Sequence, residues 1–363
     1  MEERNKIERV IVSGVNLNNL RKWLIISLAL SIVSITAVML FTMSSGTVTS
    51  LTHMNPILLF AAISFQFLSW LVWGRRLQVM SEALGRRIPL KDAVAIVLSN
   101  LFAASITPAH VGGEVTRIQL LRRFNLSVGD ASAIVLGERM LDALFLGMVA
   151  PIGFILFQDK IKSSVGLTTL FAAISIIFFI IFFATLYAMA RPQNLKSLAA
   201  NFRWLIMRFR GERRTDEIMN RVFQEIDIFH NSLKIYLHEG KRALSNGFVY
   251  TVAFWTFQFS IASLILVGFG SQPWIIRSFF AQTVLMMIAM VPLTPGNSGI
   301  AEISTASIYS TFISISILGV FIITWRFISY YLNILVGGFV SLKVLKDTRT
   351  LEGTIEEVIE EIE

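Results

Sequence analysis

The sequence predicts an all-α polytopic membrane protein with about six full transmembrane helices and two re-entrant helical hairpins, arranged as an inverted-topology repeat. The chain of 363 residues is 54% hydrophobic and only 15% charged, and its mean hydropathy is +0.66. Soluble domains carry about 25% charged residues, so this composition indicates a membrane protein. Long apolar runs recur along the chain, and two shorter ones each stop at a turn rich in proline and glycine.

Six segments are long enough to be full spans, because a helix needs about 20 apolar residues to cross the hydrocarbon core. They are predicted at 23–43, 56–73, 131–157, 165–190, 246–268 and 316–342. The first has no small-residue cleavage site after it and is therefore expected to stay in the mature chain. The absence of cysteine excludes disulfides and thiolate chemistry.

The basic residues orient these spans, because Lys and Arg concentrate in cytoplasmic loops. Arg21 and Lys22 precede the first span and place the N-terminus in the cytoplasm, whereas the loop at 44–55 contains no Lys or Arg. Arg75 and Arg76 follow the second span and return the chain to the cytoplasm. The sequence therefore predicts a multi-pass plasma-membrane protein with both termini in the cytoplasm. Its net charge of +8 reflects this orientation, and nucleic acid is not an expected partner.

The expected organisation has a cytoplasmic start, one membrane domain and a cytoplasmic end. The parts are an N-terminus at 1–22, a transmembrane domain at 23–345, a basic cytoplasmic segment within it at 191–245, and an acidic tail at 346–363. The basic segment mixes arginines with aromatic residues, which suits an amphipathic helix on an anionic lipid surface or a solvated linker helix.

Two apolar segments are too short to cross a bilayer. Segment 93–107 ends in "ITPAHVGGEVTR", and a crossing there would place Arg117 outside, against the positive-inside tendency. We therefore expect a re-entrant hairpin of two half-helices, about 15 and 10 residues long, joined by the Pro-Gly turn. A short interfacial helix is the alternative. Residues 276–310 are expected to form a second hairpin, entered from outside and turning at "PLTPGNSG".

The two turns resemble each other, since each has Thr-Pro followed by glycine and then glutamate. Arg139 follows Thr107 by 32 residues, and Arg326 follows Thr294 by 32 residues. The order of span, hairpin and charged span thus occurs twice, at about 56–157 and 246–342, with opposite orientations. Inverted repeats with broken helices are typical of transporters, although chance similarity of two turns remains an alternative.

Charged residues inside the predicted membrane domain are the candidate site, because a charge at the bilayer centre costs roughly 3 kcal/mol. The candidates are Glu114, Glu138, Arg139, Asp142, Glu302 and Arg326. Glu138 and Asp142 share a helical face, and one interpretation is that these charges are ion pairs that join helices. The other is that Arg139 and Arg326 lie near the pseudo-symmetry axis and bind a phosphate, which guanidinium groups bind bidentately.

The hairpin turns would complete such a site. Half-helices that begin after Gly112, Gly113 and Gly299 would direct amide donors and positive dipole ends at an anion. Asn297 offers a polar contact, although turn chemistry alone explains it. The two hairpin glutamates would either hold the arginines when the site is empty or exchange protons.

At "TPAHVGGEVTRIQLL", "GERMLD" and "PLTPGNSGIAE" the sequence resembles the membrane domain of the lysylphosphatidylglycerol synthase/flippase proteins. The resemblance covers about 20–345 and is that of a stand-alone member, without the cytoplasmic domain that performs aminoacyl transfer. It therefore implies movement of a phospholipid between leaflets rather than synthesis.

The expected function is translocation of an anionic phospholipid or polyprenyl-phosphate lipid through a midplane site. The chain has no motif of a hydrolase, metalloprotease or nucleotide-binding enzyme, so we expect no enzymatic activity, cofactor or metal. Membrane lipids are the expected partners, and a lipid-modifying transferase and a second copy of the chain are further candidates. Two other functions stay open: a non-transporting protein that presents lipid-linked substrates to a transferase, and a small-solute or ion transporter.

Overall fold

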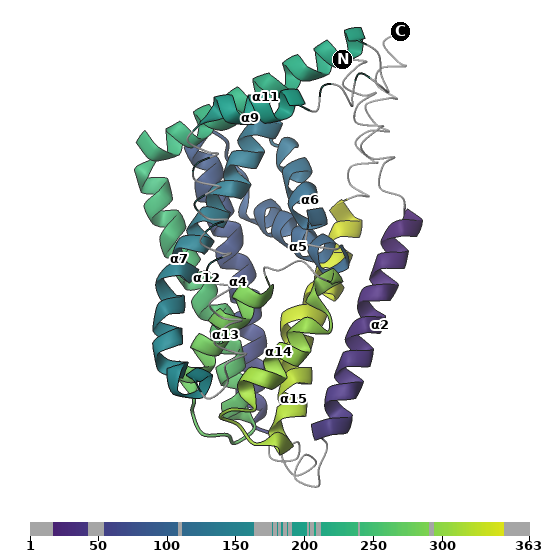
Figure 1. Ribbon diagram of the computed structural model, residues 1–363, viewed down its shortest axis with the longest axis vertical. Coiled ribbons are helices and arrows are strands. Elements are labelled where there is room, and N and C mark those ends of the chain that lie inside the picture. Colours follow the sequence, from purple (N-terminus) through teal and green to yellow (C-terminus); the bar gives the residue numbers. More distant parts are fainter. Residues whose placement is uncertain are drawn as a thin grey trace.

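The computed structural model describes residues 17–42, 54–107, 111–162, 191–201, 212–238, 240–289 and 294–344, with isolated positions between 163 and 211. Every regular element in these ranges is a helix (Figure 1). The elements are α2 (Leu17–Thr42), α4 (Pro56–Ala83), α5 (Leu90–Ile106), α6 (Val111–Arg122), α7 (Val128–Lys162), α9 (Pro192–Asn201), α11 (Glu212–His238), α12 (Lys241–Gly268), α13 (Ile275–Ala289), η2 (Pro295–Asn297), α14 (Ile300–Tyr309), α15 (Ile315–Arg326) and the π-helix η3 (Phe327–Tyr331).

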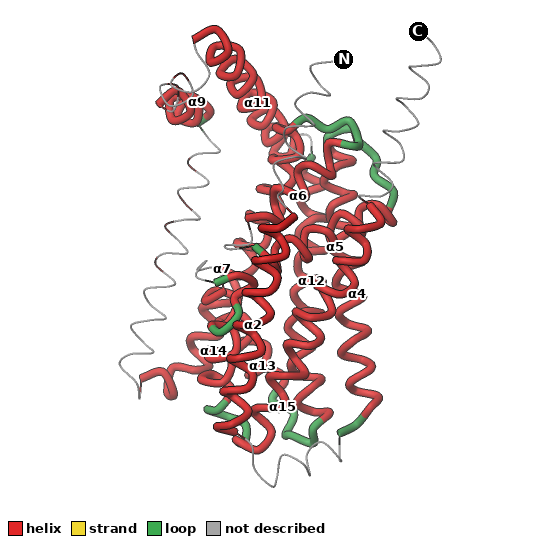
Figure 2. Tube along the Cα trace, turned by 90° about the vertical axis from the view of Figure 1, so that its right-hand side faces the viewer, coloured by secondary structure: helices red, strands yellow, loops and turns green. Residues whose placement is uncertain are grey.

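Among the described residues, three helices are long and apolar enough to cross a membrane. They are Pro56–Ala83, Lys241–Gly268 and Ile315–Val344. The first two, α4 and α12, pack against each other along their lengths (Figure 2). They correspond to predicted spans 56–73 and 246–268, and the third, formed by α15, η3 and the helix that follows, corresponds to 316–342.

Helix α4 runs well beyond the predicted end of its span at residue 73. It passes through Gly74 and continues to Ala83, and Gly85, whose φ of 75° is left-handed, follows its end. Arg75 and Arg76 therefore lie inside the helix and not in a cytoplasmic loop. The prediction that they begin a loop was wrong, and Arg76 is 1% exposed.

Two other helices match predicted spans, and one prediction falls outside the described residues. Helix α2 covers most of 23–43 and begins earlier, and α7 covers 131–157 and is 35 residues long. Segment 165–190 lies almost entirely outside the described residues, as do residues 1–16 and the acidic tail 346–363.

Two helical hairpins lie between the long helices. Helix α5 packs on α6, and α13 packs on α14, in two different halves of the molecule along its long axis (Figure 1). The hairpin tips meet near the middle. The hydroxyl of Tyr330 donates to the carbonyl oxygen of Ser105 at 3.2 Å, and the same carbonyl lies 2.7 Å from where a Cβ on Gly296 would be.

The glycines have different tasks in the two hairpins. Gly112 and Gly113 were expected to be turn residues that precede a half-helix, but they lie in the first turn of α6. A Cβ on Gly113 would lie 2.8 Å from the Asn100 carbonyl oxygen on α5, so this glycine permits close helix packing. Gly296 and Gly299 have φ of 57° and 87° and do form the second turn.

The basic segment 191–245 is folded onto the membrane-domain helices. Helix α11 packs on α7, and α9 packs on α11 at one end of the molecule (Figure 1). The hydroxyl of Tyr236 donates to the carbonyl oxygen of Met80 at 2.8 Å, and the backbone N–H of Gly129 donates to Glu225 at 2.6 Å. The apolar face of α11 is therefore at least partly occupied by the protein itself, rather than wholly available to a lipid surface.

Candidate functional site

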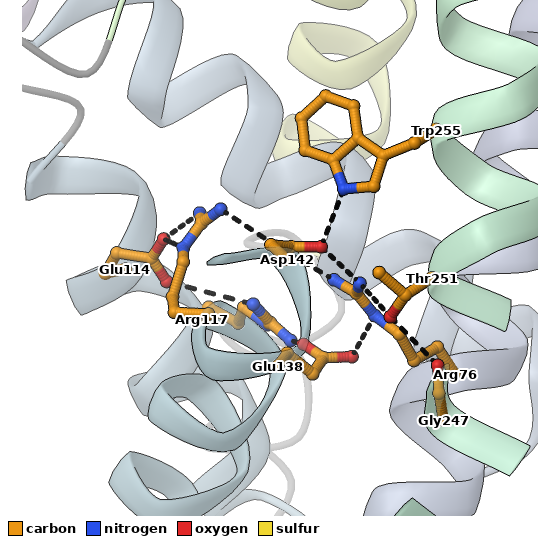
Figure 3. Close-up of polar contacts among 9 residues, drawn as sticks. Arg76, Glu114, Arg117, Glu138, Asp142, Gly247, Thr251 and Trp255 are labelled. Carbon is orange, nitrogen blue, oxygen red and sulfur yellow. Dashed lines mark hydrogen bonds and ion pairs between the residues drawn. The ribbon is translucent and has the colours of Figure 1, made fainter. Parts of the chain in front are cut away.

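The first hairpin and its neighbours surround a buried network of ionic side chains (Figure 3). Three arginines and three carboxylates balance in formal charge, which allows them to be buried together. Helix α4 supplies Arg76, α6 supplies Glu114 and Arg117, and α7 supplies Glu138, Arg139 and Asp142.

Arg76 joins two carboxylates of α7 to α12. Its Nε donates to Glu138 Oε1 at 3.1 Å, and its Nη1 donates to Asp142 Oδ1 at 2.6 Å and to Thr251 Oγ1 at 2.9 Å. Trp255 Nε1 also donates to Asp142 Oδ1, at 3.0 Å (Figure 3). Glu138 and Asp142 lie four residues apart on α7, so both can face the same guanidinium group, as their spacing predicts.

Arg117 fills the space between the hairpin and α7. Its Nη2 pairs with Glu138 Oε2, and its Nη1 lies 3.8 Å from Glu114 Oε2. The side chains of Arg117 and Glu138 are both 0% exposed. Glu138 therefore stands between two arginines, one on each carboxylate oxygen, and removing it would leave both cations short of counter-charge.

The outer side of the network is the pair formed by Glu114 and Arg139. Arg139 Nε donates to Glu114 Oε1 at 2.8 Å, and its Nη2 contacts the same oxygen. Arg139 Nη1 also lies 3.5 Å from Asp142 Oδ2. The Arg139 side chain is 37% exposed and that of Glu114 is 27% exposed, so this pair is the part of the network that a ligand can reach from outside.

The ring of Trp73 lies beside all three arginines of the network. The guanidinium carbons of Arg117, Arg76 and Arg139 lie 5.5, 5.7 and 6.0 Å from the Trp73 ring centroid. An aromatic face attracts cations and holds little water, so Trp73 strengthens the ionic contacts around it.

The second hairpin carries a smaller ionic cluster. Arg326 Nε donates to Glu302 Oε1 at 2.8 Å, and its Nη2 donates to Ser298 Oγ at 3.4 Å. The other oxygen of Glu302 accepts the backbone N–H of Gly299 at 2.7 Å, which satisfies one amide at the start of α14. The side chains of Arg326 and Glu302 are 5% and 0% exposed, so this pair is closed.

Side chains from other helices complete this cluster. The hydroxyl of Ser31 on α2 donates to Glu302 Oε1 at 3.1 Å and lies 2.6 Å from the hydroxyl of Tyr331. The guanidinium of Arg326 lies 4.1 Å from the centroid of the Tyr330 ring. Tyr330 and Tyr331 belong to the π-helix η3, and such irregular turns frequently occur at functional sites.

The structure places the predicted residues in two matching pairs. In each hairpin a glutamate pairs with the arginine on the helix that follows, at sequence separations of 25 for Glu114–Arg139 and 24 for Glu302–Arg326. The two arginines therefore each have a carboxylate of their own. Gly112 and Gly113 lie within α6, and Gly299 is the N-cap of α14. The binding of a phosphate by these residues stays a prediction.

Sequence reasoning missed two members of the first network. Arg76 was expected in a loop, and Arg117 served only to argue the topology. Arg117 follows Glu114 by three residues, so a helical α6 places both on one face, and this signal could have found it. In the described residues, no group of three or more His, Asp or Glu side chains has the arrangement of a metal site.

A buried, charge-balanced network between long apolar helices and two helical hairpins defines a helical membrane protein with a polar interior. The family model for the lysylphosphatidylglycerol synthase transmembrane region matches residues 24–337. The chain belongs to this family.

The similar proteins are archaeal. A UPF0104 membrane protein of Archaeoglobus fulgidus is 31% identical over 306 residues, which cover 84% of this chain and 92% of that protein. A UPF0104 membrane protein of Pyrococcus horikoshii is 23% identical over 295 residues, covering 78% of this chain and 85% of that protein. One from Methanothermobacter thermautotrophicus is 23% identical over 282 residues, covering 76% and 82%.

Proposed function

We propose that this protein moves an anionic lipid between the leaflets of the plasma membrane, and that Arg139 and Arg326 bind the lipid phosphate in turn. The observation that carries this proposal is the repeated Glu–Arg pair, Glu114–Arg139 and Glu302–Arg326, with one pair for each hairpin. The substrate class is a phospholipid or a polyprenyl-phosphate lipid. The family supports this choice, since its description names the transmembrane region of a lysylphosphatidylglycerol synthase.

In this proposal the two hairpins are re-entrant and enter the membrane from opposite sides. They form an inverted repeat among six spans, and both chain termini are cytoplasmic. The proposal is supported by the positions of the hairpins in two halves of the molecule and by the contact of their tips at Ser105 and Gly296. Transporters with inverted repeats place their substrate sites where such broken helices meet.

The glutamates act as internal substitutes for phosphate. A guanidinium group binds a carboxylate or a phosphate with the same two parallel N–H donors. An arriving phosphate can therefore replace Glu114 on Arg139 without leaving the arginine unpaired. Glu114 then keeps Arg117, 3.8 Å away, as a counter-charge. This exchange avoids the cost of a lone buried charge at each step.

The unequal exposure of the two pairs suits alternating access. Arg139 is 37% exposed and Arg326 is 5% exposed, so in this conformation the first arginine is the accessible one. We propose that the lipid phosphate binds first at Arg139. A change at the hairpin tips then opens the second pair and closes the first.

Proteoliposomes that contain fluorescent phosphatidylglycerol test the proposal. Dithionite added outside reduces only the outer-leaflet label, so a protein that moves the lipid makes the inner-leaflet label accessible. In the double variant Arg139→Ala/Arg326→Ala the rate of lipid movement should fall at least about tenfold, the decrease expected when about 1.4 kcal/mol of phosphate binding is lost. Arg277→Ala is the matched control, because Arg277 lies over the Trp274 ring at the start of α13 and outside both pairs. An unchanged rate in the double variant contradicts the proposal.

A further inference from the structure

Helix α2 precedes both copies of the repeat in the chain and packs on both hairpins. It lies along one side of the molecule (Figure 1). It contacts α14 and α15 of the second copy, α5, which leads to the first hairpin tip, and η2, which forms the second tip. Helix α2 therefore covers the region where the two hairpins meet, next to the second Glu–Arg pair.

Ser31 is the residue through which α2 reaches that pair. Among the α2 residues whose side chains are described, Ser31 alone is buried, whereas Ile32 and Val33 beside it are 60% and 67% exposed. Its hydroxyl donates to Glu302 Oε1 at 3.1 Å and lies 2.6 Å from the hydroxyl of Tyr331. At this level, α2 is a single layer of helix between the ion pair and the outside of the molecule.

The helices that supply the pair also reach the surface at this level. Ile303 directly follows Glu302 and is 61% exposed, and Phe327 directly follows Arg326 and is 48% exposed. The side chains of Glu302 and Arg326 are themselves buried. The pair therefore lies just below the surface of its own helices, and α2 covers it there.

A lipid would reach Arg326 from the side, because its chains stay in the hydrocarbon of the bilayer. Moving a chain into water costs free energy for every CH₂ group, so the headgroup enters between helices. The exposed side chains of α2 are apolar, and lipid chains are as apolar as leucine, so exchanging helix contacts for lipid contacts costs little. Within the described part of the chain, the hydrogen bonds of Ser31 are the side-chain hydrogen bonds that join α2 to other helices.

We propose that α2 is a lateral gate on the second pair and that Ser31 holds this gate closed. This inference rests on the proposed lipid function and adds the route by which the phosphate reaches Arg326. The gate and the ion pair share one atom, because Glu302 Oε1 accepts both Ser31 Oγ and Arg326 Nε. Movement of α2 away from the pair removes one donor from this oxygen, and the exchange of Glu302 for a phosphate then becomes easier.

Joining α2 to η3 tests whether α2 must move. The chain has no cysteine, so the two cysteines introduced in Ser31→Cys/Tyr331→Cys are its only thiols. The short bifunctional reagent o-phenylenedimaleimide should join them, because the two hydroxyls lie 2.6 Å apart in the wild type. Joining should reduce the movement of fluorescent phosphatidylglycerol to the rate in protein-free liposomes. N-ethylmaleimide modifies the same cysteines without joining them, and the rate should then stay above that background.

A second pair of cysteines controls for the crosslinking itself. Phe65→Cys/Phe257→Cys places them on α4 and α12, where the two rings lie 5.1 Å apart and the helices pack along their lengths. These two helices stay together in the proposal, so joining them should leave the same rate as N-ethylmaleimide does. Equal losses in both joined proteins would contradict the gate.

The rate of crosslinking in detergent tests the gate without requiring transport. A lipid phosphate on Arg326 should hold α2 open. Excess phosphatidylglycerol should therefore slow the joining of residues 31 and 331 about tenfold, the shift that about 1.4 kcal/mol of differential binding produces. Diacylglycerol has the chains without the phosphate and should not slow it. Inorganic phosphate should not slow it either, because the gate opens to the bilayer and not to water. Adding Arg326→Ala/Glu302→Gln should remove the effect of phosphatidylglycerol.

Ser31→Ala gives a second test that needs no cysteines. Loss of one hydrogen bond of about 1 kcal/mol loosens the gate and should raise the rate of lipid movement about fivefold. A hydroxyl with only a structural role would leave the rate unchanged or lower it when removed. Ser34→Ala is the matched control, because Ser34 donates to the Ser31 carbonyl oxygen within α2, and its rate should equal that of the wild type.

Four results would overturn the inference. They are undiminished lipid movement after residues 31 and 331 are joined, crosslinking that phosphatidylglycerol does not slow, crosslinking that inorganic phosphate slows equally, and a rate in Ser31→Ala at or below that of the wild type. A wild-type protein that moves no lipid, but whose crosslinking is slowed by phosphatidylglycerol alone, would refute the proposed translocation and support the gate. A protein that moves lipid equally well with α2 joined would refute the gate alone.

Discussion

Each hairpin supplies the glutamate of a Glu–Arg pair, but the two pairs lie in different surroundings. Glu114–Arg139 is the outer edge of a network with three arginines and three carboxylates, and Arg139 is 37% exposed. Glu302–Arg326 is an ion pair among hydroxyls and a tyrosine ring, with side chains 0% and 5% exposed. We call the first pair open, because the Arg139 side chain is exposed, and the second pair closed, because both of its side chains are buried.

The two pairs also differ in the counter-charges that stay beside each side chain when the pair separates. Arg117 stays beside Glu114 at 3.8 Å, and Asp142 stays beside Arg139 at 3.5 Å, so each member of the first pair keeps a counter-charge. Among the described residues, Arg326 would keep Ser298 and the ring of Tyr330, which are neutral. Because an unpaired buried charge is costly, the first pair can exchange its partner more easily than the second.

The largest effect on stability should come from the carboxylate inside the first network. Glu138→Ala leaves Arg76 and Arg117 short of a partner and should lower the free energy of unfolding by about 3–5 kcal/mol. Thermal unfolding in detergent measures this. Asp227→Ala is the control, because Asp227 pairs with Lys196 at the surface and exposed pairs contribute at most about 1 kcal/mol. Equal losses in the two variants would mean that the network does not stabilise the fold.

Replacing Arg326 should lower the free energy of unfolding more than replacing Arg139, because the first pair keeps counter-charges and, among the described residues, the second does not. Arg326→Ala strands the buried Glu302 and should cost about 3 kcal/mol, whereas Arg139→Ala leaves Glu114 near Arg117 and should cost about 1 kcal/mol. Adding Glu302→Gln to Arg326→Ala should recover part of the loss, since it removes the stranded charge. The melting temperatures of the three variants measure this order. Similar losses for the two single variants would remove the distinction between an open and a closed pair.

Composition and the breaks in the apolar runs were enough to predict the helical membrane class and both hairpins. Helix α5 ends at Ile106 and α13 ends at Ala289, close to where the sequence interrupts the two shorter apolar runs. The ends of the helices were harder to predict, as α4 shows. Its apolar run stops at Trp73, but the helix ends only before Gly85, and Arg76 is therefore inside it.

The partners of the charges could not be predicted from spacing alone. Arg76 pairs with residues 62 and 66 positions away, and this proximity is set by packing of α4 against α7 and α12. The roles of the glycines were also ambiguous. A pair of glycines a few residues after a proline suggests a turn, but Gly113 serves the packing of α6 on α5, which only the arrangement of the two helices reveals.

The contact between the hairpin tips should be sensitive to one methyl group. A Cβ on Gly296 would lie 2.5 Å from the Tyr330 hydroxyl and 2.7 Å from the Ser105 carbonyl oxygen, whereas a Cβ on Gly299 would meet open space. Both glycines have positive φ, so alanine strains both positions. In addition to its backbone strain, Gly296→Ala should cost about 1–3 kcal/mol, the range for overpacking.

Thermal unfolding measures both losses, but the strain differs, because Gly296 (φ 57°, ψ 20°) lies near the left-handed helical region and Gly299 (φ 87°, ψ −53°) lies outside it. Tyr330→Phe combined with Gly296→Ala should recover part of the loss, since it removes the hydroxyl but leaves the Ser105 carbonyl in place. If Tyr330→Phe recovers none of the loss in Gly296→Ala, the hairpin tips do not touch in solution, and the proposed coupling between them loses its structural basis.

The smallest effect should come from α2, which contacts the closed pair through one hydroxyl. Ser31→Ala removes the donor to Glu302 and the partner of Tyr331, and should cost about 1 kcal/mol because Glu302 keeps Arg326 and the Gly299 N–H. Ser34→Ala is the control, since Ser34 bonds only within its own helix. Tyr331→Phe should lose less in the Ser31→Ala background than in the wild type, because both changes break the same contact. Additive losses would show that α2 is not joined to the closed pair, and both pairs would then be held by the repeats alone.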